Sequence, residues 1–288
     1  MNRFRILHRT YYNFSGAVVL GPHVLRLRPR EGHDLRIESS RLEIEPAAQL
    51  SWYRDAENNI LGVATFATPA TQLAIVSDLV VQQYNSNSAV TNAPSAVWPI
   101  VYEAIDAVTL AHYRQVGGPQ RAVDELMSAL AQQGCGAVGQ PIHQAMVQIS
   151  QHIRTSIRYV VRPEAGVQSP GDTLGLGSGS CRDMAALFVE VARRFGLASR
   201  FVSGYLRVDA SGPNLGATHA WAEVYLPGIG WTGFDPTSDG AVGPDHFAVA
   251  VARDPGTVPP VSGSFSGACG TTLDVGVWVT PLPDAGPA

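Results

Sequence analysis

The sequence has little charge and no long apolar run. Only 15% of its 288 residues are charged, whereas 45% are hydrophobic, which is typical of a globular chain with a substantial core. No segment reaches the roughly 18 consecutive apolar residues that a membrane-spanning helix needs. The N-terminus also lacks the apolar stretch of a signal peptide. We therefore expect a cytoplasmic location and no membrane partner.

Basic clusters are equally scarce. The formal net charge is −4 and the sequence pI is about 6.0, so we expect no nucleic-acid partner. One short basic run, from Arg26 to Arg30, alternates with leucine and proline. This alternation favours the solvent face of a strand over a binding site for an anion.

Cysteine is too rare for a disulfide scaffold. The three cysteines, Cys135, Cys181 and Cys269, are widely spaced, and their odd number leaves at least one free thiol. No CxxC or HxxxH pair is present, so a zinc site made of Cys181, His219 and Cys269 would have no motif spacing behind it. No acidic loop of the EF-hand type occurs either. We expect neither a metal nor another cofactor.

Strand periodicity dominates the first 85 residues. Apolar residues alternate from Phe4 to Tyr12 and recur around 35–37, 42–44 and 73–81, with turn-forming residues between these segments. Residues 1–85 therefore predict an N-terminal antiparallel β-sandwich-like domain. Residues 86–118, rich in Asn, Ser, Pro and Gly, predict a connector with room for one helix.

The remainder of the chain, residues 119–288, predicts an α+β domain. Apolar residues with helical spacing occur in 120–133 and 142–157, ahead of the segment that contains Cys181. Short apolar runs follow after Gly196, and we expect them to be strands of one sheet. These runs are 201–206, 219–226, 230–234, 247–252 and 273–280.

Cys181 stands where a small-residue loop meets a predicted helix. Apolar residues at Met184, Leu187, Phe188 and Val191 form one stripe, and Gly196 supplies a C-terminal stop. A thiol in the first helical turn lies among unsatisfied N–H groups at the positive end of the helix dipole, which favours the thiolate of a nucleophile. Alone, this pattern fits a small buried cysteine equally well.

His219 and Asp235 follow Cys181 in the order that thiol catalysis needs. His219 begins one predicted strand, Asp235 ends the next, and the turn at 226–230 predicts that these strands pair antiparallel. The pairing would bring Asp235 beside His219 to orient the imidazole. If Ala220 and Ala222 face the cysteine helix, strict alternation turns His219 away from it. Either the Trp221 face meets the helix, or His219 precedes the regular pleat.

Four motifs in this part of the chain resemble the bacterial transglutaminase-like proteins, a group within the transglutaminase-like cysteine protease superfamily. They are Gly179-Ser180-Cys181-Arg182-Asp183-Met184-Ala185, Arg200-Phe201-Val202-Ser203-Gly204-Tyr205-Leu206, Thr218-His219-Ala220-Trp221-Ala222-Glu223-Val224-Tyr225 and Trp231-Thr232-Gly233-Phe234-Asp235-Pro236-Thr237. The N-terminal β-domain of that family is echoed by 8–12 and 23–30, and its C-terminal segment by 249–254. The resemblance thus extends over most of the chain.

The resemblance implies a papain-like core in which a cysteine-bearing helix packs on an antiparallel sheet. It assigns Cys181 as nucleophile, His219 as general base and acid, and Asp235 as the orienting carboxylate. Arg182 departs from the glutamine or acidic residue that many relatives have after the cysteine, which bears on substrate choice. Tyr159 and Trp221 are weaker candidates for an oxyanion donor and a pocket wall, because aromatic residues in such segments are more often core.

The implied function is thiol-dependent acyl transfer or hydrolysis at a carboxamide or peptide bond of a protein or peptide substrate, through a thioester. A papain-like peptidase or amidase shares the same triad and stays an alternative. An alternative of another class is a retired enzyme that serves as a binding or assembly module. The sequence leaves open the substrate, the acyl acceptor, the oligomeric state and the role of the N-terminal domain.

Overall fold

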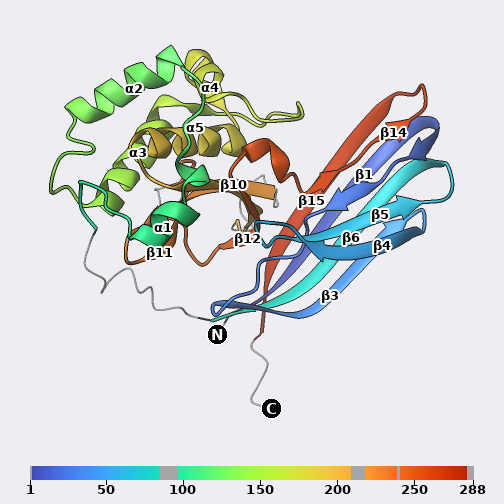
Figure 1. The fold of residues 1–288 in the computed structure, drawn as a ribbon. Coiled ribbons are helices and arrows are strands. Elements are labelled where there is room, and N and C mark those ends of the chain that lie inside the picture. Colours follow the sequence, from blue (N-terminus) through green and yellow to red (C-terminus); the bar gives the residue numbers. More distant parts are fainter. Residues whose placement is uncertain (1, 85–95, 209–217, 239–240, 284–288) are drawn as a thin grey trace.

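The computed structural model describes residues 2–84, 96–208, 218–238 and 241–283. It consists of a long β-domain beside a mixed domain in which helices cover one sheet (Figure 1). The β-domain contains two antiparallel sheets, in the strand orders β14-β1-β6-β3, with β15 also paired to β1, and β13-β2-β5-β4. These strands are β1 (Asn2–Leu20), β2 (His23–Leu25), β3 (Leu35–Glu45), β4 (Ala48–Arg54), β5 (Ile60–Phe66), β6 (Ala70–Gln83), β13 (Val261–Ser262), β14 (Phe265–Ser266) and β15 (Thr271–Leu282).

The mixed domain has a four-stranded antiparallel sheet in the order β11-β10-β9-β12. Its strands are β9 (Ser199–Leu206), β10 (Thr218–Leu226), β11 (Gly230–Phe234) and β12 (His246–Ala252), and a short parallel pair is formed by β7 (Arg158–Tyr159) and β8 (Ser178–Gly179). Its helices are α1 (Ala104–Thr109), α2 (Arg121–Gln132), α3 (Ile142–Ser156), α4 (Pro170–Leu176) and α5 (Cys181–Arg194), with 3₁₀ turns η2 (His112–Arg114) and η3 (Pro255–Thr257). The α+β class and the cysteine helix on an antiparallel sheet are thus confirmed.

Helix α5 forms the centre of the mixed domain. The predicted stripe of Met184, Leu187, Phe188 and Val191 is buried, and all the remaining residues from Asp183 to Arg193 are buried as well. The helix packs between the four-stranded sheet on one side and helices α2 and α3 on the other. On the sheet side, Ala222 and Val224 belong to the same apolar cluster as the buried residues of α5. It ends as expected, since Gly196 follows in the left-handed region with φ of 87°.

One strand was placed in the wrong sheet by the sequence analysis. The run 273–280 was expected to join the sheet of the domain assigned to 119–288. Instead, β15 pairs along β1, from Arg3 opposite Leu282 to Phe14 opposite Thr271. A strand whose apolar and polar residues alternate has the same sequence pattern in the sheet of the β-domain and in the sheet of the mixed domain. Only the long-range pairing with β1 decides where it lies.

The two domains share buried polar contacts. The ring of His8 on β1 lies 3.1 Å from the hydroxyl of Tyr205 on β9, and that hydroxyl donates to the carbonyl oxygen of Leu27 at 3.0 Å. Burial lowers the pKa of His8 to about 4, so this histidine is a neutral structural residue at physiological pH. Within the described ranges, no helix is long and apolar enough to cross a membrane.

Candidate active site

Cys181 is the first residue of α5 and is partly exposed. The preceding strand β8 pairs in parallel with β7, with Arg158 opposite Ser178 and Tyr159 opposite Gly179. This pairing fixes the chain immediately before the cysteine. Because a residue in the first turn has no intrahelical acceptor for its N–H, the backbone amide of Cys181 can donate outward.

His219 and Asp235 are brought together by the hairpin of β10 and β11. The register places Ala222 opposite Phe234, so Asp235 follows directly at the end of β11. His219 Nε2 lies 2.8 Å from Asp235 Oδ2. Since an ionised carboxylate can only accept, Nε2 carries the proton and Nδ1 is left to face the thiol.

The side chains of His219 and Cys181 also interact, although Ala220 and Ala222 pack on the side of the sheet toward α5. His219 is the second residue of β10, and Cys181 is the first residue of α5. The contact is therefore made where strand and helix both begin, at the end of the sheet. Neither alternative from the sequence was correct, because the alanine face meets the helix while His219 lies within the strand.

The charge state of His219 is set by its partners. Burial alone lowers the pKa of His219, but the hydrogen bonds with Asp235 and Cys181 and the charges of both groups raise it to about 9. The imidazole is therefore held as an imidazolium in the neutral pH range. This is the state from which a proton can be delivered to a leaving group.

We expect the free energy of unfolding to fall as the pH rises from 6.5 to about 9. A group whose pKa is raised on folding stabilises the folded state fully below its unfolded value of 6.5, and this contribution is lost through its folded value of about 9. Urea unfolding at several pH values tests this. The His219→Gln variant should show a smaller decrease over the same range, and an identical decrease would contradict the assignment.

Asp235 is fully buried and accepts four hydrogen bonds. Oδ2 accepts from His219 at 2.8 Å and from His246 Nε2 at 3.1 Å, while Oδ1 accepts from the backbone N–H and the hydroxyl of Thr237 at 2.9 and 2.7 Å. Burial raises the pKa of a carboxyl, but these donors hold the pKa of Asp235 far below its usual range. Asp235 is therefore a permanent carboxylate beside His219.

Tyr159 lies beside the thiol. Its side chain interacts with that of Cys181, since β7 runs next to the chain that leads into α5. Burial, the charge of Cys181 and the hydrogen bond to it raise the pKa of Tyr159 to about 12. The phenol thus stays protonated and is available as a donor next to Cys181.

Trp221 is a core residue, which is the alternative that the sequence favoured for it. It is 1% exposed and packs with Val202 and Val251, and its ring is 5.1 Å from that of His246 and 6.1 Å from that of His219. A fully buried ring cannot line a substrate pocket, so the prediction of Trp221 as a wall beside the thiol is corrected. Its packing supports the two imidazoles.

Asp183 was not singled out from the sequence, although it organises the start of α5. Its buried carboxylate accepts from the backbone N–H and hydroxyl of Ser180 at 2.8 and 2.7 Å, from the N–H of Gln168 at 2.8 Å, and from Arg162 at 2.9 and 3.0 Å. The spacing Ser180-x-x-Asp183 before an apolar run is a helix-start signal that could have revealed it.

Arg182 points toward the loop that precedes α4. Its guanidinium donates to the carbonyl oxygens of Arg162 and Glu164, so it contributes to holding that loop beside Cys181. The set of Cys181, His219 and Cys269 is not brought together, because Cys269 packs against an apolar cluster of the β-domain.

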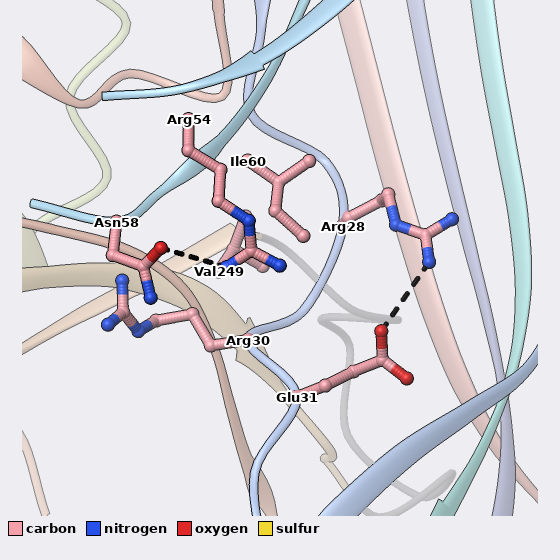
Figure 2. A pocket seen from close by; sticks show the side chains of 7 residues that line it. All are labelled: Arg28, Arg30, Glu31, Arg54, Asn58, Ile60 and Val249. Carbon is pink, nitrogen blue, oxygen red and sulfur yellow. Dashed lines mark hydrogen bonds and ion pairs between the residues drawn. The ribbon is translucent and has the colours of Figure 1, made fainter.

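The basic run 26–30 lies outside a strand, which corrects the expectation of a solvent-facing strand. Arg28 and Arg30 line a small pocket together with the β4–β5 turn and β12 (Figure 2). Its lining residues are Arg28, Arg30, Glu31, Arg54, Asn58, Ile60 and Val249. Arg54 donates to Asn58 at 2.8 Å, and Arg28 lies 3.6 Å from Glu31. The pocket contains none of the residues around Cys181.

Comparisons with known families match two parts of the chain. Residues 4–82 match the bacterial transglutaminase-like N-terminal region, and residues 128–236 match the transglutaminase-like superfamily. The second match contains Cys181, His219 and Asp235.

Proteins that are similar over nearly all of this chain occur in mycobacteria, and a solved structure has a similar fold. An uncharacterized protein of Mycobacterium leprae is 29% identical over 98% of this chain and 100% of its own length. An uncharacterized protein of Mycobacterium tuberculosis is 28% identical over 98% of this chain and 93% of its own length. The crystal structure of a "putative cysteine protease" from Cytophaga hutchinsonii covers 99% of this chain and 92% of its own, with a TM-score of 0.74 and 17% identity. This likeness establishes the fold.

Proposed function

We propose that this chain is a thiol-dependent acyl-transfer enzyme. The proposal starts from two matches: residues 4–82 match the bacterial transglutaminase-like N-terminal region, and residues 128–236 match the transglutaminase-like superfamily. The enzyme's substrates are carboxamide or peptide groups of proteins or peptides. The observation that carries the proposal is that His219 interacts with Cys181 at the start of α5 and forms a 2.8 Å hydrogen bond with Asp235.

The proposed reaction proceeds in two stages. The Cys181 sulfur attacks the carbonyl carbon to form a C–S bond, and the C–N bond breaks while the His219 imidazolium gives its proton to the departing ammonia or amine. In the second stage, neutral His219 removes a proton from an incoming amine or water. That molecule attacks the thioester, the C–S bond breaks, and the sulfur again pairs with protonated His219.

The negative oxygen that develops in each stage needs donors. The backbone N–H of Cys181 stands at the first helical position, where it has no intrahelical acceptor, and the Tyr159 side chain interacts with that of Cys181. Two donors that converge on one carbonyl oxygen form an oxyanion hole. We therefore propose Tyr159, together with the Cys181 amide, as the oxyanion donors.

The test is the identity of the products formed from a glutamine-containing peptide, with and without an added primary amine. All 20 basic residues are arginine and the sequence contains no lysine, so the chain offers no side-chain amine for self-crosslinking. Any amine adduct on the peptide therefore reports the added amine. Mass spectrometry and ammonia release should show turnover by the wild type and none by Cys181→Ala.

The products also separate the forms of the proposed function. An amine adduct indicates transamidation, a glutamate product indicates amidase activity, and a cut peptide indicates a peptidase. If no peptide is turned over and Cys181 is alkylated by iodoacetamide no faster than Cys269, the acyl-transfer proposal fails. A retired binding or assembly module would then be the better explanation.

A further inference from the structure

His246, the first residue of β12, contacts the same carboxylate oxygen as His219 but was not noticed in the sequence. Its side chain is 7% exposed, and its Nε2 lies 3.1 Å from Asp235 Oδ2. Its other ring nitrogen, Nδ1, accepts a hydrogen bond from the backbone N–H of Gly243 at 3.2 Å. Both nitrogens are therefore occupied inside the protein.

These two contacts determine where the proton of His246 resides. A backbone N–H can only donate, so Nδ1 of His246 has no proton, and the ring is neutral with its proton on Nε2. His246 consequently donates to Asp235, just as His219 does. The two imidazoles hold Oδ2 from one side while Thr237 holds Oδ1 from the other.

The same atoms also resemble a metal site. One ligand atom each from His219, Asp235 and His246 lie within 4.8 Å of one another. To ligate a cation through Nε2, His246 would have to move its proton to Nδ1, where the Gly243 N–H already points. The arrangement therefore favours a hydrogen-bond network over a metal centre.

We propose that His246 is a positioning residue for the acyl-transfer reaction, and this inference rests on the proposed function. By donating to Oδ2 it fixes the rotation of the Asp235 carboxylate. The fixed carboxylate in turn keeps the Nε2–H of His219 directed away from Cys181 and its Nδ1 directed toward it. Trp221, edge-on to His246 at 5.1 Å, holds the ring in place.

Two variants separate the donor of His246 from its packing. His246→Phe keeps a ring against Trp221 but has no N–H, whereas His246→Gln keeps an amide donor close to the position of Nε2. We expect His246→Phe to lower both the rate of Cys181 alkylation by iodoacetamide and peptide turnover by about 10- to 100-fold, the size of the loss when a partner that orients a metal-ligating histidine is removed. His246→Gln should recover most of both rates. His112→Phe, at a half-exposed histidine outside the site, is the matched control.

Nitrogen-15 NMR of the imidazoles gives a readout that packing alone would not move. We expect His246 as the neutral Nε2–H tautomer in the wild type, and a changed His219 signal in His246→Phe. Should His246→Phe fail to fold, His246→Asn replaces it, because its amide ends near Nδ1 and does not reach Asp235.

The outcomes distinguish the two proposals. Wild-type rates in His246→Phe, rates in His246→Gln as low as in His246→Phe, an Nδ1–H tautomer, or a stoichiometric metal in the purified protein would each overturn the positioning role. A chain that turns over no peptide would defeat the proposed function, whereas alkylation and NMR would still decide the role of His246.

Discussion

Asp235→Asn is expected to lower kcat/KM for peptide turnover by about 10⁴-fold, the loss seen when the carboxylate of a catalytic triad becomes an amide. The reason is specific to this site. Asp235 accepts from His219 and His246 on one oxygen and twice from Thr237 on the other. An asparagine offers only one oxygen, so in either orientation its NH₂ group faces at least one N–H donor.

The two orientations of the asparagine amide have different consequences. If the NH₂ group faces the imidazoles, Nε2 of His219 must lose its proton to accept from it, so the imidazolium that pairs with the Cys181 sulfur is lost. If it faces Thr237, the partly buried backbone N–H of Thr237 loses its acceptor, which costs about 1–3 kcal/mol, while the Thr237 hydroxyl can turn to accept from the amide. Turnover and urea unfolding should be measured together. Asp245→Asn, at a partly exposed carboxylate paired with Arg207, is the control, and comparable turnover by both variants would contradict the assignment.

Asp183→Asn is expected to destabilise the protein by about 3–5 kcal/mol, the usual cost of breaking a buried ion pair on one side. The Asp183 side chain is fully buried, and that of its partner Arg162 is 16% exposed. Burial raises the pKa of a carboxyl, but the hydrogen bonds from Gln168, Ser180 and Arg162 lower that of Asp183. Its contribution is therefore present at neutral pH and is lost only as the pH falls through its folded pKa.

The measurement is urea unfolding at pH 7, with the midpoint and slope of the transition compared between variants. Asp124→Asn makes the same chemical change at a carboxylate that is 57% exposed and pairs with Arg194, and should change stability by less than about 1 kcal/mol. Equal unfolding midpoints for the two variants would show that Asp183 does not anchor the start of α5.

Local signals explain what the sequence predicted well. The start and end of α5 follow from the apolar spacing and from Gly196, and the β10–β11 hairpin follows from the turn at 226–230. A hairpin fixes its own register, so the proximity of His219 and Asp235 could be predicted. Such short-range arguments account for most of the candidate site.

Non-local pairing explains what the sequence did not show. His246 follows a Gly- and Pro-containing loop, and nothing near it in the sequence indicates that β12 lies two strands away from β10, next to β9. Trp221 has the pattern of a strand residue on either face, so its full burial depends on Val202 and Val251 from other strands. The position of His246 and the burial of Trp221 are determined only when the strands of the sheet pair, so the local sequence does not predict them.

The pairing of β1 with β15 affects the order in which the chain can complete its fold during synthesis. β1 is synthesised well before β15, the strand that covers one of its edges from Arg3 opposite Leu282 onward. While the mixed domain between these strands is synthesised, β1 therefore presents an open edge to other nascent chains. Arg3, Arg5 and Arg9 place charges along this strand, which discourages edge-to-edge association. These charges would oppose such association until β15 pairs with β1 and the ring of Trp278 lies against Arg9.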